Sequence, residues 1–260
     1  MKNTLLIVLS FCLTPFFCFA EDDWGQNGHR AVAEIAFQYL DEDVKQKILD
    51  LLDGESLATA STFADEIKSD KKYDAYKVWH YVNIPLNSNY NEAEKNEDGD
   101  LIIGIQKSIA ILKDETSAKN TKQFHLKILI HLIGDLHQPF HVGLKEDRGG
   151  NDFDVFWFGE HTNIHKLWDT QLIESYNMSY TELATNKFPF REIEVNQFKE
   201  KTLLEWLAET HKLTNQVYAS ALPNENLSYA YTYKWFPVLR QQLHKAGIHL
   251  AAQLNKIFKI

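Results

Sequence analysis

Apolar residues recur along most of the chain at spacings of three and four positions, which is the period of an amphipathic helix. The pattern is clearest in segments 31–40, 44–52, 102–112, 124–136, 203–222 and 231–257. Alternation with a period of two, typical of strands, is confined to short pieces such as 154–158. The pattern therefore predicts an all-α fold with at most a small β-hairpin.

Two polar stretches interrupt the helical pattern, at 87–100 and 145–151, and both are predicted to be loops. Neither is long enough or biased enough in composition to link two domains, and no segment repeats with a fixed period. A chain of this length can bury a large core without disulfides. We therefore expect residues 21–260 to form a single domain.

The first twenty residues have the features of a secretory signal peptide. A basic start at Lys2 is followed by the apolar run 5–17, and the stretch closes on Cys18, Phe19 and Ala20 in a small-x-small pattern. The run is shorter than the roughly 20 residues that a membrane-spanning helix needs. We expect residues 1–20 to be removed and the mature protein to be secreted or periplasmic, without stable membrane association.

Both cysteines, Cys12 and Cys18, lie in the segment that we expect to be removed. The mature chain would then contain no thiol and no disulfide, although it enters an oxidising compartment. A lipid anchor on Cys18 is the alternative, and the bulky Phe17 before it argues against an anchor.

The formal net charge of -9 is unusual for a protein that meets nucleic acid, because such proteins normally carry a basic surface. If this chain binds nucleic acid, the positive charge must come from a source other than Lys and Arg. The sequence indicates no obligate protein partner.

Two histidine–aspartate pairs are candidates for metal ligation. His131 and Asp135 lie four residues apart, on one face of a predicted helix that ends before Pro139, and His141 lies on the following turn. His165 and Asp169 repeat the four-residue spacing. A single such pair is more often a solvated helix face or an ion pair, but two pairs close together favour a metal site.

Two further histidines are candidates because of their settings. His29 ends the run Trp24-Gly-Gln-Asn-Gly-His29, just after the predicted signal peptide, and His80 lies between Trp79 and Tyr81. Taken alone, either histidine is more often structural than ligating.

Six short motifs occur in a fixed order: Trp24-Gly-x3-His29, Ala64-Asp65-x2-Lys68, His80-Tyr81, Gly134-Asp135-Leu-His-Gln-Pro-Phe-His141, Gly149-Gly150-Asn151 and Asn163-Ile-His165-x2-Trp168-Asp169. With these motifs the chain resembles the zinc-dependent single-strand nucleases of fungi, plants and bacteria, the family that includes mung bean nuclease. The resemblance extends by motif from residue 24 to about residue 172, and the helical remainder is compatible in length.

The resemblance implies about three Zn²⁺ ions per chain. One zinc would be held by Asp65, His80, His131 and Asp135. A second would be held by Trp24, His29 and Asp135, whose carboxylate would bridge the two ions. A third would be held by His141, His165 and Asp169. The remaining histidines match no ligand position: His125, His137, His161, His211, His244 and His249.

The resemblance also implies hydrolysis of phosphodiester bonds to 5′-phosphate products. The zinc ions would supply the positive charge that the acidic composition lacks. Asp65, besides binding zinc, would orient the attacking water, and Lys68 would hold a phosphate oxygen. The alternative for Lys68 is an ordinary surface lysine.

The expected substrates are single-stranded DNA and RNA, with 3′-nucleotides as a further substrate. Tyr81 would stack on a base, which favours unpaired strands because a duplex presents no free base face. Asn83 would bind a base edge, and Asn151 would contact the nucleotide. The alternative for Tyr81 is core packing.

The N-terminus departs from the family pattern. Relatives usually begin at the tryptophan, whose amine and carbonyl bind zinc, whereas cleavage after Ala20 would leave Glu21, Asp22 and Asp23 in front of Trp24. Either further trimming exposes the amine of Trp24, or a carboxylate replaces it; trimming is favoured because a further negative charge would oppose substrate phosphate.

Two other functions are compatible with these residues. A zinc-dependent phospholipase C shares the fold and the zinc cluster but usually ends its last ligand pair in Glu, whereas this chain has Asp169. A non-catalytic, zinc-binding secreted protein is the second alternative, and a complete ligand set that includes Asp65 argues against it.

Overall fold

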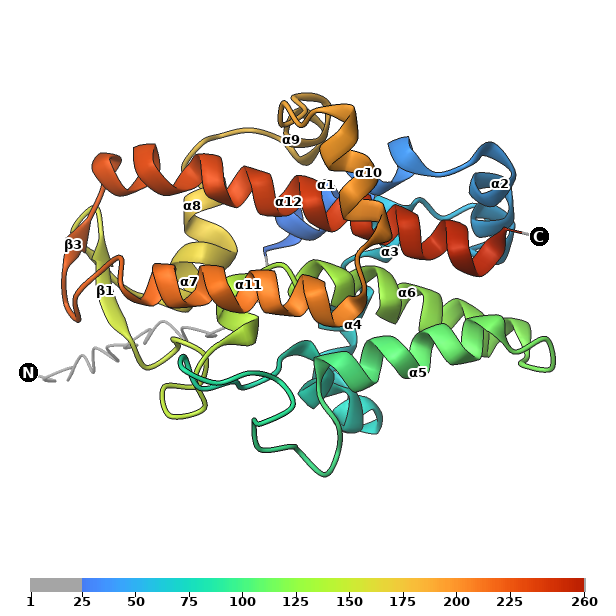
Figure 1. Ribbon diagram of the computed structural model, residues 1–260, viewed down its shortest axis with the longest axis horizontal. Coiled ribbons are helices and arrows are strands. Elements are labelled where there is room, and N and C mark those ends of the chain that lie inside the picture. The colour runs from blue at the N-terminus through green and yellow to red at the C-terminus, as the bar shows by residue number, and fades with distance from the viewer. Residues whose placement is uncertain (1–24, 260) are drawn as a thin grey trace, which may run out of the picture.

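The computed structural model describes residues 25–259, so the predicted signal peptide and Trp24 lie outside the described residues (Figure 1). The α-helices are α1 (Gln26–Tyr39), α2 (Glu42–Leu51), α3 (Leu57–Ala60), α4 (Phe63–Glu66), α5 (Leu101–Lys113), α6 (Lys119–Asp135), α7 (Ile164–Lys166), α8 (Leu172–Glu174), α9 (Tyr180–Thr185), α10 (Glu192–Glu200), α11 (Leu203–Tyr218) and α12 (Tyr229–Phe258). Three segments form 3₁₀-helices, η1 (Ile67–Ser69), η2 (Lys71–His80) and η3 (Pro139–Val142), and η4 (Leu167–Gln171) is a short π-helix. The predicted all-α fold is confirmed.

The long helix α12 extends along most of the molecule in Figure 1, and α1 packs along it. The apolar stripe of α1, which includes Val32 and Ile35, is buried in this contact. The two helices approach closely at Gly247, where an added Cβ would lie only 2.5 Å from Cγ2 of Ile35. A glycine at this position therefore allows the two helix backbones to meet.

Helices α5 and α6 form a second packed pair. Asp100 begins α5 by accepting a hydrogen bond from the N–H of Ile103 (3.0 Å), as an N-cap residue does. Gly104 allows close contact between the helices, because a Cβ there would lie 2.9 Å from Leu132 and from Trp79. Helix α6 also contacts α1, α4 and α12, and each of its residues from 128 to 135 is buried.

A small sheet lies at one end of the molecule. Strands β1 (Asp154–Trp157) and β2 (Glu160–Asn163) form the expected antiparallel hairpin, whose two-residue turn has positive φ at Phe158 (51°) and Gly159 (86°), as a type I′ turn requires. A third strand, β3 (Asn226–Leu227), pairs with β1 in parallel. Two residues are too few to show alternation, so this strand had no signal in the sequence.

Three helix boundaries differ from the apolar pattern by four or five residues. Helix α6 begins at Lys119 rather than at residue 124, because its first residues are polar. Helix α1 begins at Gln26 rather than at residue 31, because its first turn is mostly polar, and it therefore includes His29. Helix α11 ends at Tyr218, before the end of the expected segment 203–222, and Leu222 is 71% exposed. Both predicted loops are confirmed, and none of the described helices is long and apolar enough to cross a membrane.

Candidate metal centre

The predicted ligands, apart from Trp24, come together from elements spread over the chain. They are His29 on α1, Asp65 on α4, His80 at the end of η2, His131 and Asp135 on α6, His141 on η3, His165 on α7 and Asp169 on η4. They form three groups in which the potential ligand atoms lie within 4.8 Å of one another: His29, His131 and Asp135; Asp65, His80 and His131; and His141, His165 and Asp169. The third group matches the expected set.

The first two groups share His131, which the sequence assigned to one ion only. The rings of His29 and His131 are stacked, with centroids 3.8 Å apart and an interplanar angle of 15°. His131 therefore lies beside His29 as well as beside His80, whose Nδ1 is 3.1 Å from its Nε2.

Asp135 is fully buried, and its two carboxylate oxygens face different histidines. Oδ2 lies 3.0 Å from Nδ1 of His80 and 3.2 Å from Nε2 of His131. Oδ1 lies 3.3 Å from Nε2 of His29 and 3.5 Å from Nδ1 of His141. One carboxylate is thus placed between two sets of ring nitrogens, as a bridging ligand would be.

Backbone carbonyls orient three of the histidines. Nδ1 of His131 lies 2.7 Å from the carbonyl oxygen of Ser61, Nδ1 of His165 lies 2.6 Å from that of Gly149, and Nδ1 of His141 lies 2.7 Å from that of His80. A carbonyl oxygen can only accept, so Nδ1 carries the hydrogen in each ring. In the neutral form Nε2 then has a lone pair available for a metal.

The third group surrounds the carboxylate of Asp169. Oδ2 of Asp169 lies 2.7 Å from Nε2 of His165, and Oδ1 lies 3.6 Å from Nε2 of His141. The backbone carbonyl of Asp169 accepts a hydrogen bond from the N–H of Gly25 (2.8 Å), so the described chain begins beside this group. The predicted ligand Trp24 precedes Gly25 and lies outside the described residues.

Unsatisfied acceptors indicate that these groups fit metal ions. Both carboxylate oxygens of Asp135, and Oδ2 of Asp169, are buried and accept no well-oriented hydrogen bond from residues 25–259. Buried carboxylates without partners are costly, and they are normally paired or bind metals. Imidazole nitrogens and carboxylate oxygens are also the donor atoms that zinc takes in catalytic sites.

The pKa shifts of the residues in the centre also favour a bound cation. Burial opposes ionisation of Asp135, but His131 and His141 hold the pKa of its carboxyl well below the usual value. Burial also opposes a charge on His131, yet Asp135 and Asp65 raise the pKa of its ring to about 10. Burial and the charge of Lys68 lower the pKa of His80 to about 3. The carboxylates therefore attract positive charge strongly, and a divalent cation can supply that charge in place of a proton.

Glycines create room at the centre, and the sequence interpretation missed this role. A Cβ on Gly134 would lie 2.8 Å from Nδ1 of His29, so α6 can approach the His29 ring only without a side chain there. Gly149 has a φ of 66°, and a Cβ on it would lie 2.5 Å from the carbonyl oxygen of Phe140. The signal was present in the sequence, since Gly134 directly precedes Asp135 and Gly149 begins the motif Gly149-Gly150-Asn151.

The predicted substrate residues lie at the edge of this centre. Tyr81 follows His80 in extended backbone and is 40% exposed, so the core-packing alternative is wrong. The N–H of Val82 donates to the carbonyl of His141 (2.8 Å), and Val82 and Ile84 are buried, whereas Asn83 is half-buried. Tyr81 and Asn83 therefore share the outward side of this segment.

Lys68 and Asn151 make local contacts. Nζ of Lys68 lies 3.0 Å from Oδ1 of Asp65, the oxygen that is 3.3 Å from Nε2 of His131. Lys68 therefore contacts a predicted metal ligand. The side-chain amide of Asn151 donates to the carbonyl of Arg148 (2.9 Å) and thus stabilises its own loop.

The other histidines lie outside the three groups. They are His125, His137, His161, His211, His244 and His249. His137 and His249 are buried and contact each other, with Nε2 and Nδ1 2.6 Å apart. His161 is exposed and lies 3.2 Å from Asp154. Their environments are those of packing or surface residues.

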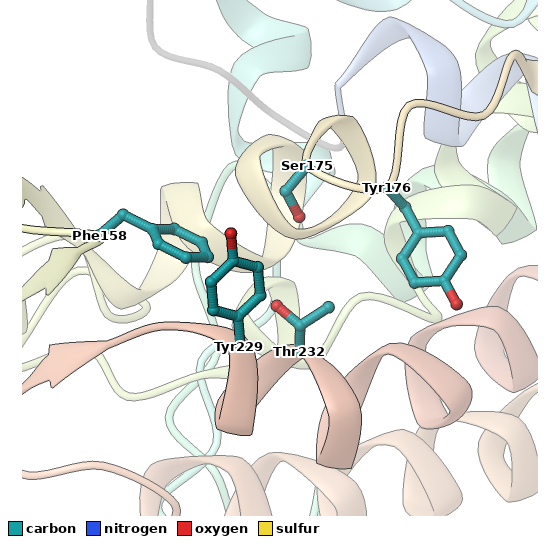
Figure 2. Close-up of a pocket in the computed structure, with 5 residues that line it drawn as sticks. All are labelled: Phe158, Ser175, Tyr176, Tyr229 and Thr232. Carbon is teal, nitrogen blue, oxygen red and sulfur yellow. The ribbon is translucent and has the colours of Figure 1, made fainter.

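A shallow hollow of about 520 Å³ lies elsewhere on the surface, between the β1–β2 turn, the end of α8 and the start of α12 (Figure 2). Its lining comprises Phe158, Ser175, Tyr176, Tyr229 and Thr232. The lining contains neither a predicted metal ligand nor a positively charged side chain. The hollow therefore lacks the groups that a phosphodiester would need.

The chain is similar to known proteins over most of its length. The sequence model of the S1/P1 Nuclease family matches residues 24–259. Endonuclease 4 of Arabidopsis thaliana is 31% identical over 269 aligned positions, covering 90% of this chain and 89% of the relative. Endonuclease 2 of the same plant is 26% identical, covering 97% and 98%, and Nuclease S1 of Aspergillus oryzae is 28% identical, covering 90% and 91%.

Proposed function

The chain belongs to the S1/P1 nuclease family and is a nuclease, and on that premise we propose a three-zinc endonuclease that cuts single-stranded DNA and RNA to 5′-phosphate products. The family is zinc-dependent. The observation that carries the three-ion proposal is the placement of two buried carboxylates. The two oxygens of Asp135 face different histidines, and Asp169 lies beside His165 in a separate group. Relatives named as nucleases favour this activity over that of a phospholipase C.

The ligands would hold three ions. Asp65, His80 and His131 would bind the first zinc together with Asp135, whose Oδ2 lies beside His80 and His131. His29 and Asp135, with the N-terminal Trp24, would bind the second, and His131 lies beside this pair as well. His141, His165 and Asp169 would bind the third. Bound zinc would supply positive charge for the phosphodiester and would lower the pKa of a coordinated water.

Asp65 is the proposed carboxylate for orienting the attacking water. Its side chain is 29% exposed, whereas those of Asp135 and Asp169 are fully buried, so substrate from solvent can reach Asp65. Lys68 holds Oδ1 of Asp65 and thereby leaves the other oxygen to accept a proton from water. The ammonium group of Lys68, whose side chain is 22% exposed, would bind a phosphate oxygen of a substrate at the same edge.

Tyr81 and Asn83 are the proposed contacts to the base. The exposed ring of Tyr81 directly follows His80, so a stacked base would place its phosphate beside the centre. The buried Val82 and Ile84 anchor the segment and keep the ring pre-oriented. Stacking tolerates any base and requires an unpaired strand, which is consistent with a single-strand preference. Asn151 would reach the nucleotide only by giving up its contact with Arg148.

We also propose 3′-nucleotides as substrates, and secretion after removal of residues 1–20. The family match starts at Trp24, which supports trimming of the mature chain to that residue. A free α-amine can give up its proton to bind zinc, whereas a peptide nitrogen does so poorly. Intact-mass measurement of the exported protein tests this step: a fully active, zinc-loaded chain that starts at Glu21 would contradict the assignment of Trp24.

The activity is tested with zinc-loaded protein on single-stranded DNA, RNA, a 3′-nucleotide and phosphatidylcholine. We expect cleavage of both polynucleotides, release of phosphate from the 3′-nucleotide and no action on the lipid. Metal analysis of the same preparation should return about three zinc ions per chain. Cleavage of the lipid alone, or a preparation that holds one ion or none, would contradict the proposal.

A further inference from the structure

Gln138 is a fully buried amide between two of the proposed ligands. Its backbone N–H donates to the carbonyl of Asp135 (3.0 Å), and its own carbonyl accepts from the N–H of His141 (3.1 Å). It therefore occupies the turn that connects the end of α6 to η3.

The side chain of Gln138 contacts both sides of the third group. Its Nε2 donates to Oδ1 of Asp169, and its Oε1 accepts from the N–H of Phe140. The first contact holds the carboxylate, and the second begins the η3 turn that presents His141. One amide thus connects two ligands that are far apart in the sequence.

The contact to Asp169 distinguishes the two oxygens of that carboxylate. Oδ1 is occupied by the amide, whereas Oδ2 accepts no well-oriented hydrogen bond within the described part of the chain and lies 2.7 Å from Nε2 of His165. Oδ2 is therefore the oxygen left for an ion. We propose that Gln138 is a positioning residue for the third metal site, which it builds by holding Asp169 and the His141 turn in one geometry.

Only an amide meets both requirements at this position. A glutamate has the same shape but, when ionised, donates no hydrogen bond and adds a second buried negative charge beside Asp169. A leucine fills the space but leaves Oδ1 of Asp169 and the N–H of Phe140 without a partner in a dry interior. Outer partners of metal ligands typically contribute about 10–100-fold to metal affinity.

The inference rests on the proposed zinc centre and is tested by metal release rather than by activity. Zinc-loaded wild type, Gln138→Leu and Gln138→Glu are equilibrated with increasing concentrations of a chelator, and retained zinc is counted. We expect both variants to lose one ion at chelator activities about 10–100-fold lower than wild type does, with the other ions retained. Circular dichroism and thermal unfolding check that each variant is folded, and the isosteric Glu variant serves where the Leu variant does not fold.

Asn255→Leu is the matched control. Asn255 is a half-buried amide on α12 that also donates and accepts: it donates to the backbone carbonyl of Tyr39 (3.2 Å) and accepts from the N–H of Asp41 (3.1 Å). Neither partner belongs to the three ligand groups, so this variant should release zinc as wild type does. Release curves of the Gln138 variants that match wild type, or loss of one ion from Asn255→Leu as well, would overturn the positioning role. Wild type that binds no zinc would instead overturn the proposed function.

Discussion

Which ring nitrogen of each histidine carries the hydrogen decides what the centre can bind. His131, His141 and His165 each donate Nδ1–H to a backbone carbonyl, so that in the neutral ring Nε2 faces the carboxylates with a lone pair. Two lone-pair-bearing groups at such distances repel each other unless a proton or a cation lies between them. The arrangement therefore suits an ion better than it suits a set of isolated ion pairs.

Asp135→Asn should remove more than one ion at once. The amide loses the negative charge that faces two histidine sets, so both ions that Asp135 would share are weakened. Since changes to outer partners alone cost about 10–100-fold, we expect activity to fall by more than about 100-fold. Asp154→Asn, at an exposed carboxylate of β1, should keep full zinc and activity. Loss of a single ion with activity retained would show that Asp135 does not bridge.

Tyr81→Ala should separate substrate binding from metal binding. A stacked base contributes about 1–3 kcal/mol, so kcat/KM on single-stranded oligonucleotides should fall by about 5- to 150-fold. Zinc content should not change, because Tyr81 contributes no ligand to the three groups. Tyr233→Ala, at a tyrosine that is 87% exposed on α12, is the control and should match wild type. Unchanged kinetics of Tyr81→Ala would exclude a stacking role.

Contacts between helices fix the relative positions of the elements that carry the ligands. Helix α1, which carries His29, packs on α12, while α6, which carries His131 and Asp135, packs on α5 and also contacts α1 and α12. The turn η3, which carries His141, packs on α11, where the hydroxyl of Thr214 donates to the carbonyl of Pro139 (2.7 Å). These four ligands are therefore held by elements that pack against other helices.

Gly247→Ala tests the contact between α1 and α12. The added Cβ would lie 2.5 Å from Cγ2 of Ile35, so the helices must separate or the side chain must move. We expect the free energy of unfolding to fall by about 1–3 kcal/mol, as overpacking of a core does. Tyr233→Ala, on the exposed side of the same helix, should change it by less than about 0.5 kcal/mol. Denaturant unfolding of the zinc-loaded protein measures the free energy of unfolding of both variants. Equal values for the two would show that the helices accommodate the added methyl group without loss of stability.

At the scale of the whole molecule, the centre links segments that lie far apart in the chain. His29 on α1 and Asp169 on η4 are the first and last predicted ligands among the described residues, and the ligands between them come from five further elements. Bound ions would therefore act as crosslinks between elements, in a chain whose only cysteines are Cys12 and Cys18.

Removing zinc should lower the thermal stability of the folded protein. A ligand that binds only the native state stabilises it by about 2.7 kcal/mol at 100 times its dissociation constant. Without ions, the buried oxygens of Asp135 and Asp169 lose their counter-charge, which adds to the effect. We expect the calorimetric Tm to fall on chelation and to rise again with added zinc. An unchanged Tm would mean that no ion contributes to the fold.

The sequence by itself determined the features that depend on local spacing. The three- and four-residue period of apolar positions predicted the helices, and the same helical period placed His131 and Asp135 on one face of α6. Local geometry also accounts for the hairpin of β1 and β2. The motifs then indicated the family, because a motif consists of residue types in a fixed order along the chain. It can be recognised without knowing how the chain folds.

Only the tertiary structure decided the rest. Helix packing brings His29 against His131, and the backbone carbonyls of Ser61 and Gly149 set the hydrogen position on their histidines. The exposure of Tyr81 and the contact of Gln138 with Asp169 depend on segments that lie far apart in the sequence. The physical reason is that periodicity describes a residue's own helix or strand, whereas a partner's distance and orientation depend on how separate elements pack.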